Sequence, residues 1–194
     1  MKSTLRQIRP SISLPRRLDE VLVRDNMNTE DKPHPTVKET LVWARELHAN
    51  QTDKLGKPYI GHIERVVENL ERSFANVTDE QIHAAYLHDA MEDCGVTRNI
   101  LIARGYGERV VQVIELVTKP KDKMSNKDYE DWIKQVIASK DIDAIRVKFS
   151  DMTDNFNKKR MSLLDAQERN KLNKKYAKPF RMLVEAINLE VEQS

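Results

Sequence analysis

The segment Ala84-Ala85-Tyr86-Leu87-His88-Asp89-Ala90-Met91-Glu92-Asp93 ends an apolar helical run in four polar side chains. Thr78-Asp79-Glu80-Gln81 fits a capping box and predicts the start of this helix, and Cys94-Gly95 predicts its end. On one helix, Glu92 lies four residues after His88 and Asp93 four after Asp89, so each pair shares a face. A His-Asp pair also occurs by chance in many proteins, but burying charge is costly unless it is paired or metal-bound. We therefore interpret His88 and Asp89 as candidate metal ligands, and Glu92 and Asp93 as candidate acid–base carboxylates.

Length and composition indicate one helical domain with a terminal extension. The chain has 194 residues, only 5 glycines and 33% charged residues, which favours a soluble helical protein over a sheet-rich one. A net charge of +2 argues against wholesale nucleic-acid binding. Cys94 is the only cysteine, so no internal disulfide can form and a reducing cytoplasm is the simpler expectation. The sequence has no apolar run near the roughly 20 residues that span a bilayer. Its first residues lack the apolar core typical of a signal peptide, so we expect a soluble cytoplasmic protein.

Residues 1–35 differ in composition from the rest of the chain. We interpret them as an arm, with a short helix at 18–23, that lies on the domain or on a partner subunit of a homo-oligomer. The arm is either a partly ordered tail or a basic segment that contacts an anionic partner. Helical periodicity begins at Thr36, so 36–194 form the predicted folded domain. The basic residues and prolines of the arm are Lys2, Arg6, Arg9, Pro10, Pro15, Arg16, Arg17, Pro33 and Pro35.

Two further residues complete a candidate metal site. His62 lies at the start of the apolar stripe at 59–70, and Asp151 follows the mostly apolar run at 144–149. A lone His on an apolar face is more often a core residue, but this preference reverses if His62 faces His88 and Asp89. The set of His62, His88, Asp89 and Asp151 supplies two imidazoles and two carboxylates, which suits Mn²⁺, Fe²⁺ or Zn²⁺ better than Ca²⁺.

The C-terminal part supplies further polar residues and packing helices. Asn155 follows Asp151 by four residues and shares its helix face. Lys158-Lys159-Arg160 could attract phosphate, although a charge run is usually a solvated face. Residues 163–192 predict one or two amphipathic helices, with Pro179 as the expected break.

Taken in order, these segments resemble the HD-domain metal-dependent phosphohydrolases, and among them the (p)ppGpp hydrolase domain of the RelA/SpoT family and its small stand-alone relatives. The resemblance covers roughly residues 37–161. It implies an all-α HD-domain bundle of eight to ten helices around a central metal site. It further implies that Glu92 and Asp93 are the catalytic acids, that Asn155 faces the nucleotide, and that the metal ligands are His62, His88, Asp89 and Asp151. The matching motifs are Gly56-Lys57-Pro58-Tyr59-Ile60-Gly61-His62, Leu87-His88-Asp89-Ala90-Met91-Glu92-Asp93, Val117-Thr118-Lys119 and Val147-Lys148-Phe149-Ser150-Asp151.

The sequence departs from this family around the nucleotide. The family usually has an Arg-Lys pair in the loop after the first helix, where it packs against the guanine base; here Lys54 is kept, but Asp53 stands in place of the Arg. An acid cannot stack on a base as a guanidinium does, and it repels phosphate. The family's Asp-Arg-Leu-His-Asn segment is here Asp151-Met152-Thr153-Asp154-Asn155, and Lys158 stands where a small hydroxyl residue is common. We therefore expect an altered nucleotide pocket.

The leading prediction is a metal-dependent phosphohydrolase that removes the 3′-pyrophosphate from (p)ppGpp or a related alarmone. Mn²⁺ is the expected ion, with Fe²⁺ and Zn²⁺ as alternatives, and Lys54, Asn155 and Lys158 are the candidate substrate-binding residues. One alternative is a hydrolase of another nucleotide, such as an adenine alarmone or a (deoxy)nucleoside phosphate, because Asp53 could accept hydrogen bonds from an amino group or a sugar hydroxyl. Another is a non-catalytic binding module that uses the basic arm, although the retained ligands and acids argue against it. We expect a nucleotide partner and no membrane or nucleic-acid contact.

Overall fold

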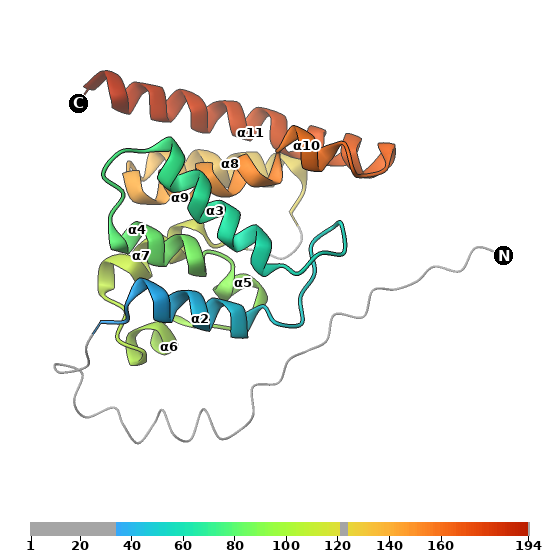
Figure 1. The fold of residues 1–194 in the computed structure, drawn as a ribbon. Coiled ribbons are helices and arrows are strands. Elements are labelled where there is room, and N and C mark those ends of the chain that lie inside the picture. The colour runs from blue at the N-terminus through green and yellow to red at the C-terminus, as the bar shows by residue number, and fades with distance from the viewer. Residues whose placement is uncertain (1–33, 121–123, 194) are drawn as a thin grey trace. The chain divides into compact units, whose positions relative to one another are not determined.

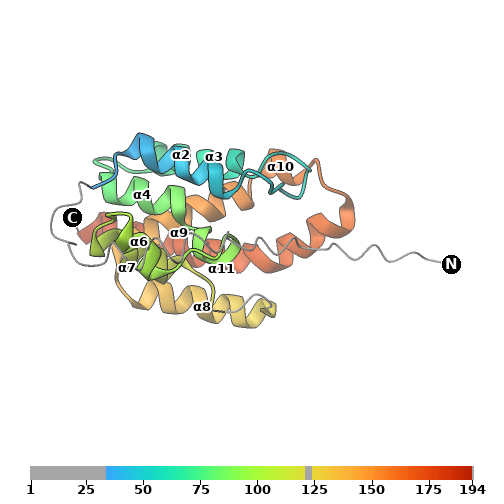
Figure 2. The ribbon, with the colours of Figure 1, turned by 90° about the horizontal axis from the view of Figure 1, so that it is seen from below.

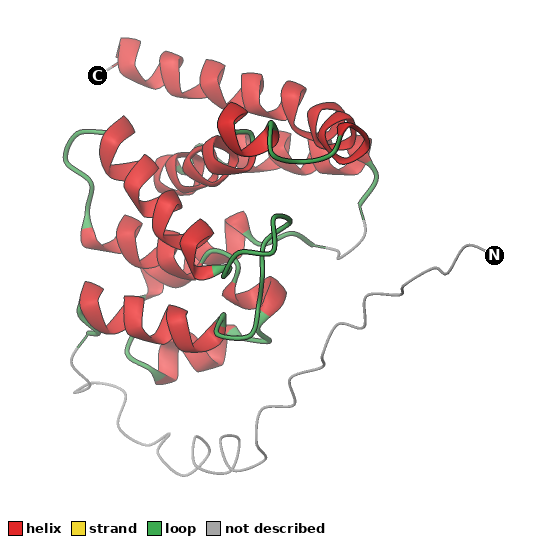
Figure 3. Ribbon diagram, turned by 45° about the vertical axis from the view of Figure 1, so that its right-hand side comes forward, coloured by secondary structure: helices red, strands yellow, loops and turns green. Residues whose placement is uncertain are grey.

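The computed structural model of the chain describes residues 34–120 and 124–193, with side chains described to residue 188. Within these residues it contains ten α-helices and no β-strand, so the predicted all-α fold is confirmed (Figures 1 and 3). Two of the helices, α5 and α10, are single turns of four residues. The helices are α2 (Val37–Leu47), α3 (Ile60–Ser73), α4 (Asp79–Leu87), α5 (Ala90–Asp93), α6 (Arg98–Ala103), α7 (Glu108–Val117), α8 (Asn126–Ala138), α9 (Ile142–Asn155), α10 (Lys158–Met161) and α11 (Ala166–Gln193).

Short polar motifs fix where several of these helices begin. Thr36, Thr78 and Ser125 each accept a hydrogen bond from the backbone N–H three residues later, and the side chain at that later position bonds back to the cap. This reciprocal pair satisfies two backbone donors that a helix start would otherwise leave unbonded. The helix starts predicted at Thr36 and Thr78 are confirmed.

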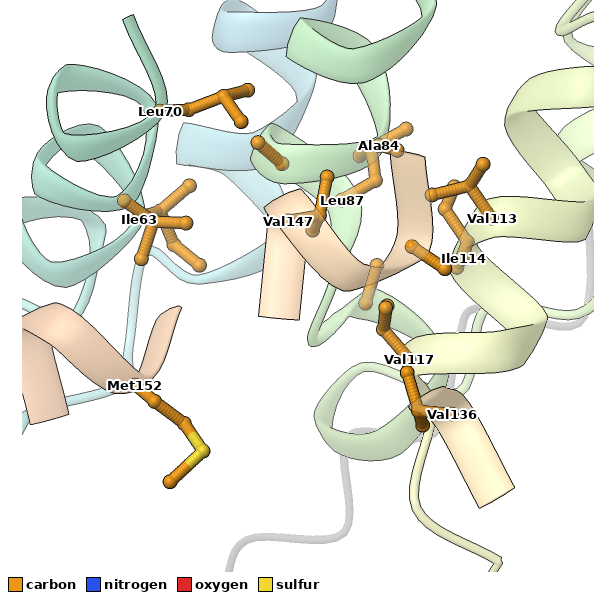
Figure 4. Packing of buried hydrophobic residues seen from close by; sticks show 14 of the residues in the cluster. Ile63, Leu70, Ala84, Leu87, Val113, Ile114, Val117, Val136, Val147 and Met152 are labelled. Carbon is orange, nitrogen blue, oxygen red and sulfur yellow. The ribbon is translucent and has the colours of Figure 1, made fainter. Parts of the chain in front are cut away.

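The centre of the fold is formed by α3, α4, α7 and α9. α3 lies along α9, and α4 packs against α2, α3 and α7 (Figure 2). Each fully buried Leu or Ile side chain contributes about 1.5–3 kcal/mol to folding, so this apolar core holds the helix ends that carry the polar segments in fixed positions. Figure 4 shows part of the core, which includes Ile63, Leu70, Ala84, Leu87, Val113, Ile114 and Val147.

The helix that was expected to run through Asp93 is interrupted at His88-Asp89. α4 ends at Leu87 and α5 begins at Ala90, so the expectation of one helix presenting all four polar residues is wrong. On a regular helix two neighbouring side chains point about 100° apart. At the break, Nε2 of His88 lies 3.1 Å from Oδ2 of Asp89. Both residues keep right-handed helical backbone angles, so the two side chains approach one another at the end of α4 without a reversal of the chain.

The C-terminal segment is one helix, α11, with Pro179 inside it. The expected break at Pro179 is wrong, because packing against α8 and α9 holds both sides of the proline in one helix. Figure 1 shows α11 at one side of the bundle and α2 at the other, with α3, α4 and α9 between them. No described helix is long and apolar enough to cross a membrane.

The predicted arm and its short helix at 18–23 lie outside the described residues, except for the last two positions, 34 and 35. At the start of the described part, Nδ1 of His34 donates a hydrogen bond to the Gly105 carbonyl at 2.9 Å. The extent of the arm stays a prediction.

Candidate metal centre and active site

The four predicted metal ligands come together in the structure. His62 lies in the first turn of α3, His88 and Asp89 in the break between α4 and α5, and Asp151 on α9. Nε2 of His88 lies 3.1 Å from Asp89 Oδ2 and 3.7 Å from Asp151 Oδ1. Nε2 of His62 lies 3.4 Å from Asp151 Oδ1 and 3.7 Å from Asp89 Oδ2. Ligand atoms of His62, His88 and Asp89 all lie within 4.8 Å of one another, which is close enough to share one ion.

The hydrogen bonds of the two imidazoles turn their Nε2 atoms toward these carboxylates. Nδ1 of His88 lies 2.8 Å from the Ala85 carbonyl, which can only accept, so this Nδ1 carries the proton. Nδ1 of His62 donates to Oδ2 of Asp154 at 2.7 Å, which fixes the same tautomer. Both Nε2 atoms are buried and have no hydrogen-bond partner among the described residues. Two buried lone pairs that face two carboxylates fit a divalent cation.

The charges of the site also favour a cation. Burial alone would raise the pKa of Asp89 and of Asp151, but the imidazoles and the Lys148 ammonium hold both pKa values well below the usual range. Burial alone would lower the pKa of His62 and of His88, but the facing carboxylates overcome this effect and raise both. The carboxylates are therefore ionised at neutral pH, and a positive charge between them and the imidazoles is stabilised.

Three neighbouring side chains orient the ligand carboxylates. The Tyr59 hydroxyl donates to Asp89 Oδ2 at 2.5 Å. The Lys148 ammonium donates to Asp151 Oδ2 at 2.7 Å, and the Asn155 amide donates to Asp151 Oδ1. The contact from Asn155 agrees with the predicted sharing of one helix face with Asp151. Hydrogen bonds of this kind fix the orientation of a metal ligand before the metal binds.

A buried ion-pair network lies behind His62, and sequence reasoning missed it. Asp154 is 2% exposed and accepts hydrogen bonds from His62 Nδ1, from two nitrogens of Arg65 at 2.7 and 3.2 Å, and from Arg160. Arg160 also donates to Oδ2 of Asp53 at 2.8 Å, so the network reaches the loop between α2 and α3. The helical spacing of Asp154 from the predicted ligand Asp151 on α9 was the available sequence signal. Arg65 is distant in sequence from Asp154, and Arg160 is distant from Asp53, although it lies only six residues from Asp154.

The carboxylate of Asp53 is used to build this loop. Its Oδ1 accepts hydrogen bonds from the backbone N–H groups of Leu55 and Lys57 at 2.9 and 3.0 Å, and its Oδ2 accepts from Arg160. Gly56 has a φ of 72°, a conformation that glycine adopts without strain, and it closes the turn. Because both oxygens already accept hydrogen bonds within the protein, the geometry favours a loop-forming role for Asp53 over recognition of an amino group on a base.

Glu92 and Asp93 lie next to the metal ligands in sequence but contact other residues. The Glu92 side chain is 7% exposed and pairs with the Lys119 ammonium, and its Oε1 accepts from the Lys119 backbone N–H at 2.6 Å. Oδ2 of Asp93 accepts from the amide of Gln51 at 2.8 Å, and Gln51 also bonds to His48. Lys119 lines a cavity beside His62, Asp89 and Asp151, whereas neither Glu92 nor Asp93 does. Their catalytic assignment stays a prediction.

A cavity of about 290 Å³ adjoins the metal centre. Two of the predicted substrate-binding residues, Lys54 and Asn155, line it. Lys158, the third, is exposed in the first turn of α10 and lies outside the lining, whereas Arg160 of the same turn is part of it. Sequence reasoning did not place four further lining residues there, namely Tyr129, Lys148, Lys175 and Tyr176.

Comparison with known proteins places this geometry in a family. A family model described as HD domain matches residues 40–183. Relatives named guanosine-3′,5′-bis(diphosphate) 3′-pyrophosphohydrolase are 35% identical over 125 residues in Vibrio cholerae and 33% identical over 146 residues in Aquifex aeolicus. These alignments cover 61% and 74% of this chain and 17% and 20% of the relatives, so the chain spans about a fifth of their length.

A solved structure supports the same fold. It comes from work on a metazoan ortholog of SpoT that hydrolyses ppGpp, and it matches this chain with a TM-score of 0.62 at 20% identity. The match covers 82% of this chain and 98% of the other. Since the family model spans residues from α2 to α11 and includes all four predicted ligands, the chain belongs to the HD-domain family.

Proposed function

We propose that this chain is a metal-dependent phosphohydrolase that removes the 3′-pyrophosphate from (p)ppGpp or a related alarmone nucleotide. The observation that carries the proposal is the pair of buried Nε2 atoms that face two ionised carboxylates beside a cavity lined with lysines. The names of the relatives in Vibrio cholerae and Aquifex aeolicus support the choice of substrate. A cytoplasmic location and a homo-oligomeric state stay predictions.

The ion would be held by His62, His88, Asp89 and Asp151, and Mn²⁺ is the proposed metal, with Fe²⁺ and Zn²⁺ as alternatives. A bound divalent ion polarises a phosphoryl oxygen and lowers the pKa of a coordinated water toward neutrality. The protein prepares the site by fixing both imidazole tautomers through Asp154 and the Ala85 carbonyl. It also holds the Asp151 carboxylate between Lys148 and Asn155.

Glu92 and Asp93 are the proposed acid–base pair. One positions or deprotonates the attacking water, and the other protonates the leaving oxygen. In the structure the Glu92 carboxylate is bonded to Lys119. A substrate phosphate that reaches the cavity next to Lys119 competes for this ammonium, and it would release a Glu92 oxygen to accept a proton. Lys54 and Asn155 line the cavity and are the proposed contacts to the nucleotide.

The test is pyrophosphate release in Mn²⁺ from guanine and adenine nucleotides, each with and without a 3′-pyrophosphate. His88→Ala serves as the blank, because it removes a ligand from the proposed metal site. We expect release only from the 3′-pyrophosphorylated guanine nucleotides, and loss of release in Glu92→Ala and Asp93→Ala proteins that still bind the metal. Release from ordinary nucleotides would refute the substrate assignment. Full activity in both carboxylate variants would refute their catalytic role. Absence of metal binding and of release would instead support the non-catalytic module.

A further inference from the structure

Two lysines that line the cavity have no carboxylate partner among the described residues. Arg160 is bonded to Asp53 and Asp154, and Lys119 and Lys148 are bonded to Glu92 and Asp151, respectively. Lys54 and Lys175 form no such ion pair within the described part of the chain. The Glu168 carboxylate acts to raise the pKa of Lys54 without forming an ion pair with it, but burial outweighs this effect and lowers the pKa. The cavity therefore contains positive charge that no ion pair among the described residues neutralises. The five cationic residues of the lining are Lys54, Lys119, Lys148, Arg160 and Lys175.

Lys175 is held at the cavity by aromatic rings. It projects from α11, and its Nζ lies 4.6 Å from the ring centroid of Tyr129 and 5.0 Å from that of Tyr176. These two rings are almost fully buried, and they pack against each other with centroids 5.7 Å apart. Contact with a ring face attracts an ammonium group but leaves its charge available to an anion. The rings thus fix the position of Lys175 without neutralising it.

This arrangement is unfavourable for the protein without a ligand. Burial, followed by the nearby ammonium groups of Lys119, Lys54 and Lys148, lowers the pKa of Lys175 to about 8. The Asp151 carboxylate acts to raise the pKa of Lys175, but it is already bonded to Lys148 and Asn155. A cluster of poorly neutralised cations next to a cavity is stabilised when an anion enters it.

We propose that Lys175, together with Lys54, binds a phosphoryl group of the substrate other than the one at the metal centre. The two lysines would then select nucleotides that carry phosphate at two positions, which specifies the substrate of the function proposed above. The ion pairs in the cavity wall support this assignment. Lys119 is bonded to Glu92, and Lys148 is bonded to Asp151, which is a proposed metal ligand. Lys54 and Lys175 are thereby left for a second group.

The test uses calorimetry to measure how tightly the full chain binds guanosine 5′-diphosphate, which has no 3′-pyrophosphate. A chelator is present to remove metal, and guanosine is the comparison ligand without phosphate. The variants are Lys175→Met, whose side chain retains contact with both rings, and Lys174→Met as the control, because Lys174 is exposed. We expect Lys175→Met to weaken binding of the diphosphate by about tenfold or more, the effect of losing one charge-assisted hydrogen bond. Guanosine binding should not change, Lys174→Met should bind as the parent does, and Lys175→Arg should retain most of the affinity.

A melting experiment separates this role from a structural one. Removing a poorly neutralised cation should raise the melting temperature of ligand-free Lys175→Met, whereas loss of a structural lysine would lower it. Unchanged diphosphate affinity in Lys175→Met, or no diphosphate binding by the parent, would overturn the inference. If diphosphate binding depends on Lys175 while no nucleotide is hydrolysed, the proposed function fails and the phosphate site stands. If Lys175→Met hydrolyses the nucleotide with the same KM as the parent, the proposed function stands and the phosphate site at Lys175 is refuted.

Discussion

Replacing Asp154 by alanine should weaken metal binding although Asp154 is not a proposed ligand. Its carboxylate accepts the Nδ1 proton of His62, and this bond keeps the lone pair of Nε2 directed at the metal centre. Without it, the imidazole can rotate or adopt the other tautomer. Loss of such a partner typically weakens metal affinity by about 10–100-fold, which corresponds to about 1.4–2.7 kcal/mol.

The same substitution should also destabilise the fold. Asp154 is the shared acceptor of Arg65 and Arg160, whose side chains are 37% and 23% exposed. Breaking a buried ion pair typically costs about 3–5 kcal/mol, and we discount this to about 2–3 kcal/mol because water can reach both guanidinium groups. For a chain of this length, the melting temperature should fall by roughly 4–12 °C.

The assay is competition for Mn²⁺ between the protein and a chromophoric chelator, followed by thermal unfolding of the same samples. Asp154→Asn is the matched control, because its amide oxygen can still accept from His62 Nδ1, and it should retain more of the metal affinity than Asp154→Ala. Mn²⁺ affinity equal to that of the parent in a folded Asp154→Ala protein would refute the argument that this carboxylate sets the tautomer of His62.

Three further predictions concern other parts of the molecule. Asp53→Ala and Arg160→Ala should be coupled by about 1 kcal/mol in a double-mutant cycle of urea unfolding, since the two side chains are bonded; additive effects would contradict this. Burial raises the pKa of the Cys94 thiol to about 12, so iodoacetamide should alkylate the native protein slowly at pH 8 and faster as the pH rises toward 12. In denaturant the thiol should react at the rate of a free thiol, and an equal rate in the native protein at pH 8 would contradict this prediction. At a hundredfold excess over Kd, Mn²⁺ should contribute about 2.7 kcal/mol, so chelation should lower the melting temperature by roughly 5–10 °C, and this change should be much smaller in His88→Ala.

Local signals in the sequence located most of the helices and the four side chains, predicted as metal ligands, that converge in the structure. The helix starts at Thr36 and Thr78 were predictable because a capping box involves residues only three positions apart. The contact of Asn155 with Asp151 was predictable for the same reason, since four residues make slightly more than one helical turn. His62 was the weakest of the ligand predictions from the residues alone, because an apolar helix face does not reveal what lies opposite to it.

The errors arose where packing overrides a local rule. Treating the helix as regular through Asp93 hid the break at His88-Asp89, where α4 ends and α5 begins. Pro179 was expected to end a helix, but α11 continues through it where it packs against α8 and α9. In the basic run at 158–160, composition alone could not distinguish the exposed Lys158 from Arg160, which turns into the cavity wall.

The two acids that distinguish this chain from the family it resembles act as one unit with Arg160. Asp53 alone would place a negative charge on the cavity wall and repel phosphate, and Asp154 alone would add a second one behind His62. Arg160 is bonded to both acids, and Arg65 is bonded to Asp154, so two carboxylates are matched by two guanidinium groups. This part of the wall is therefore close to neutral, and the charge of Lys54 and Lys175 is not cancelled by it. An acid in the loop is compatible with a phosphorylated substrate because the guanidinium of Arg160, on α10, neutralises it.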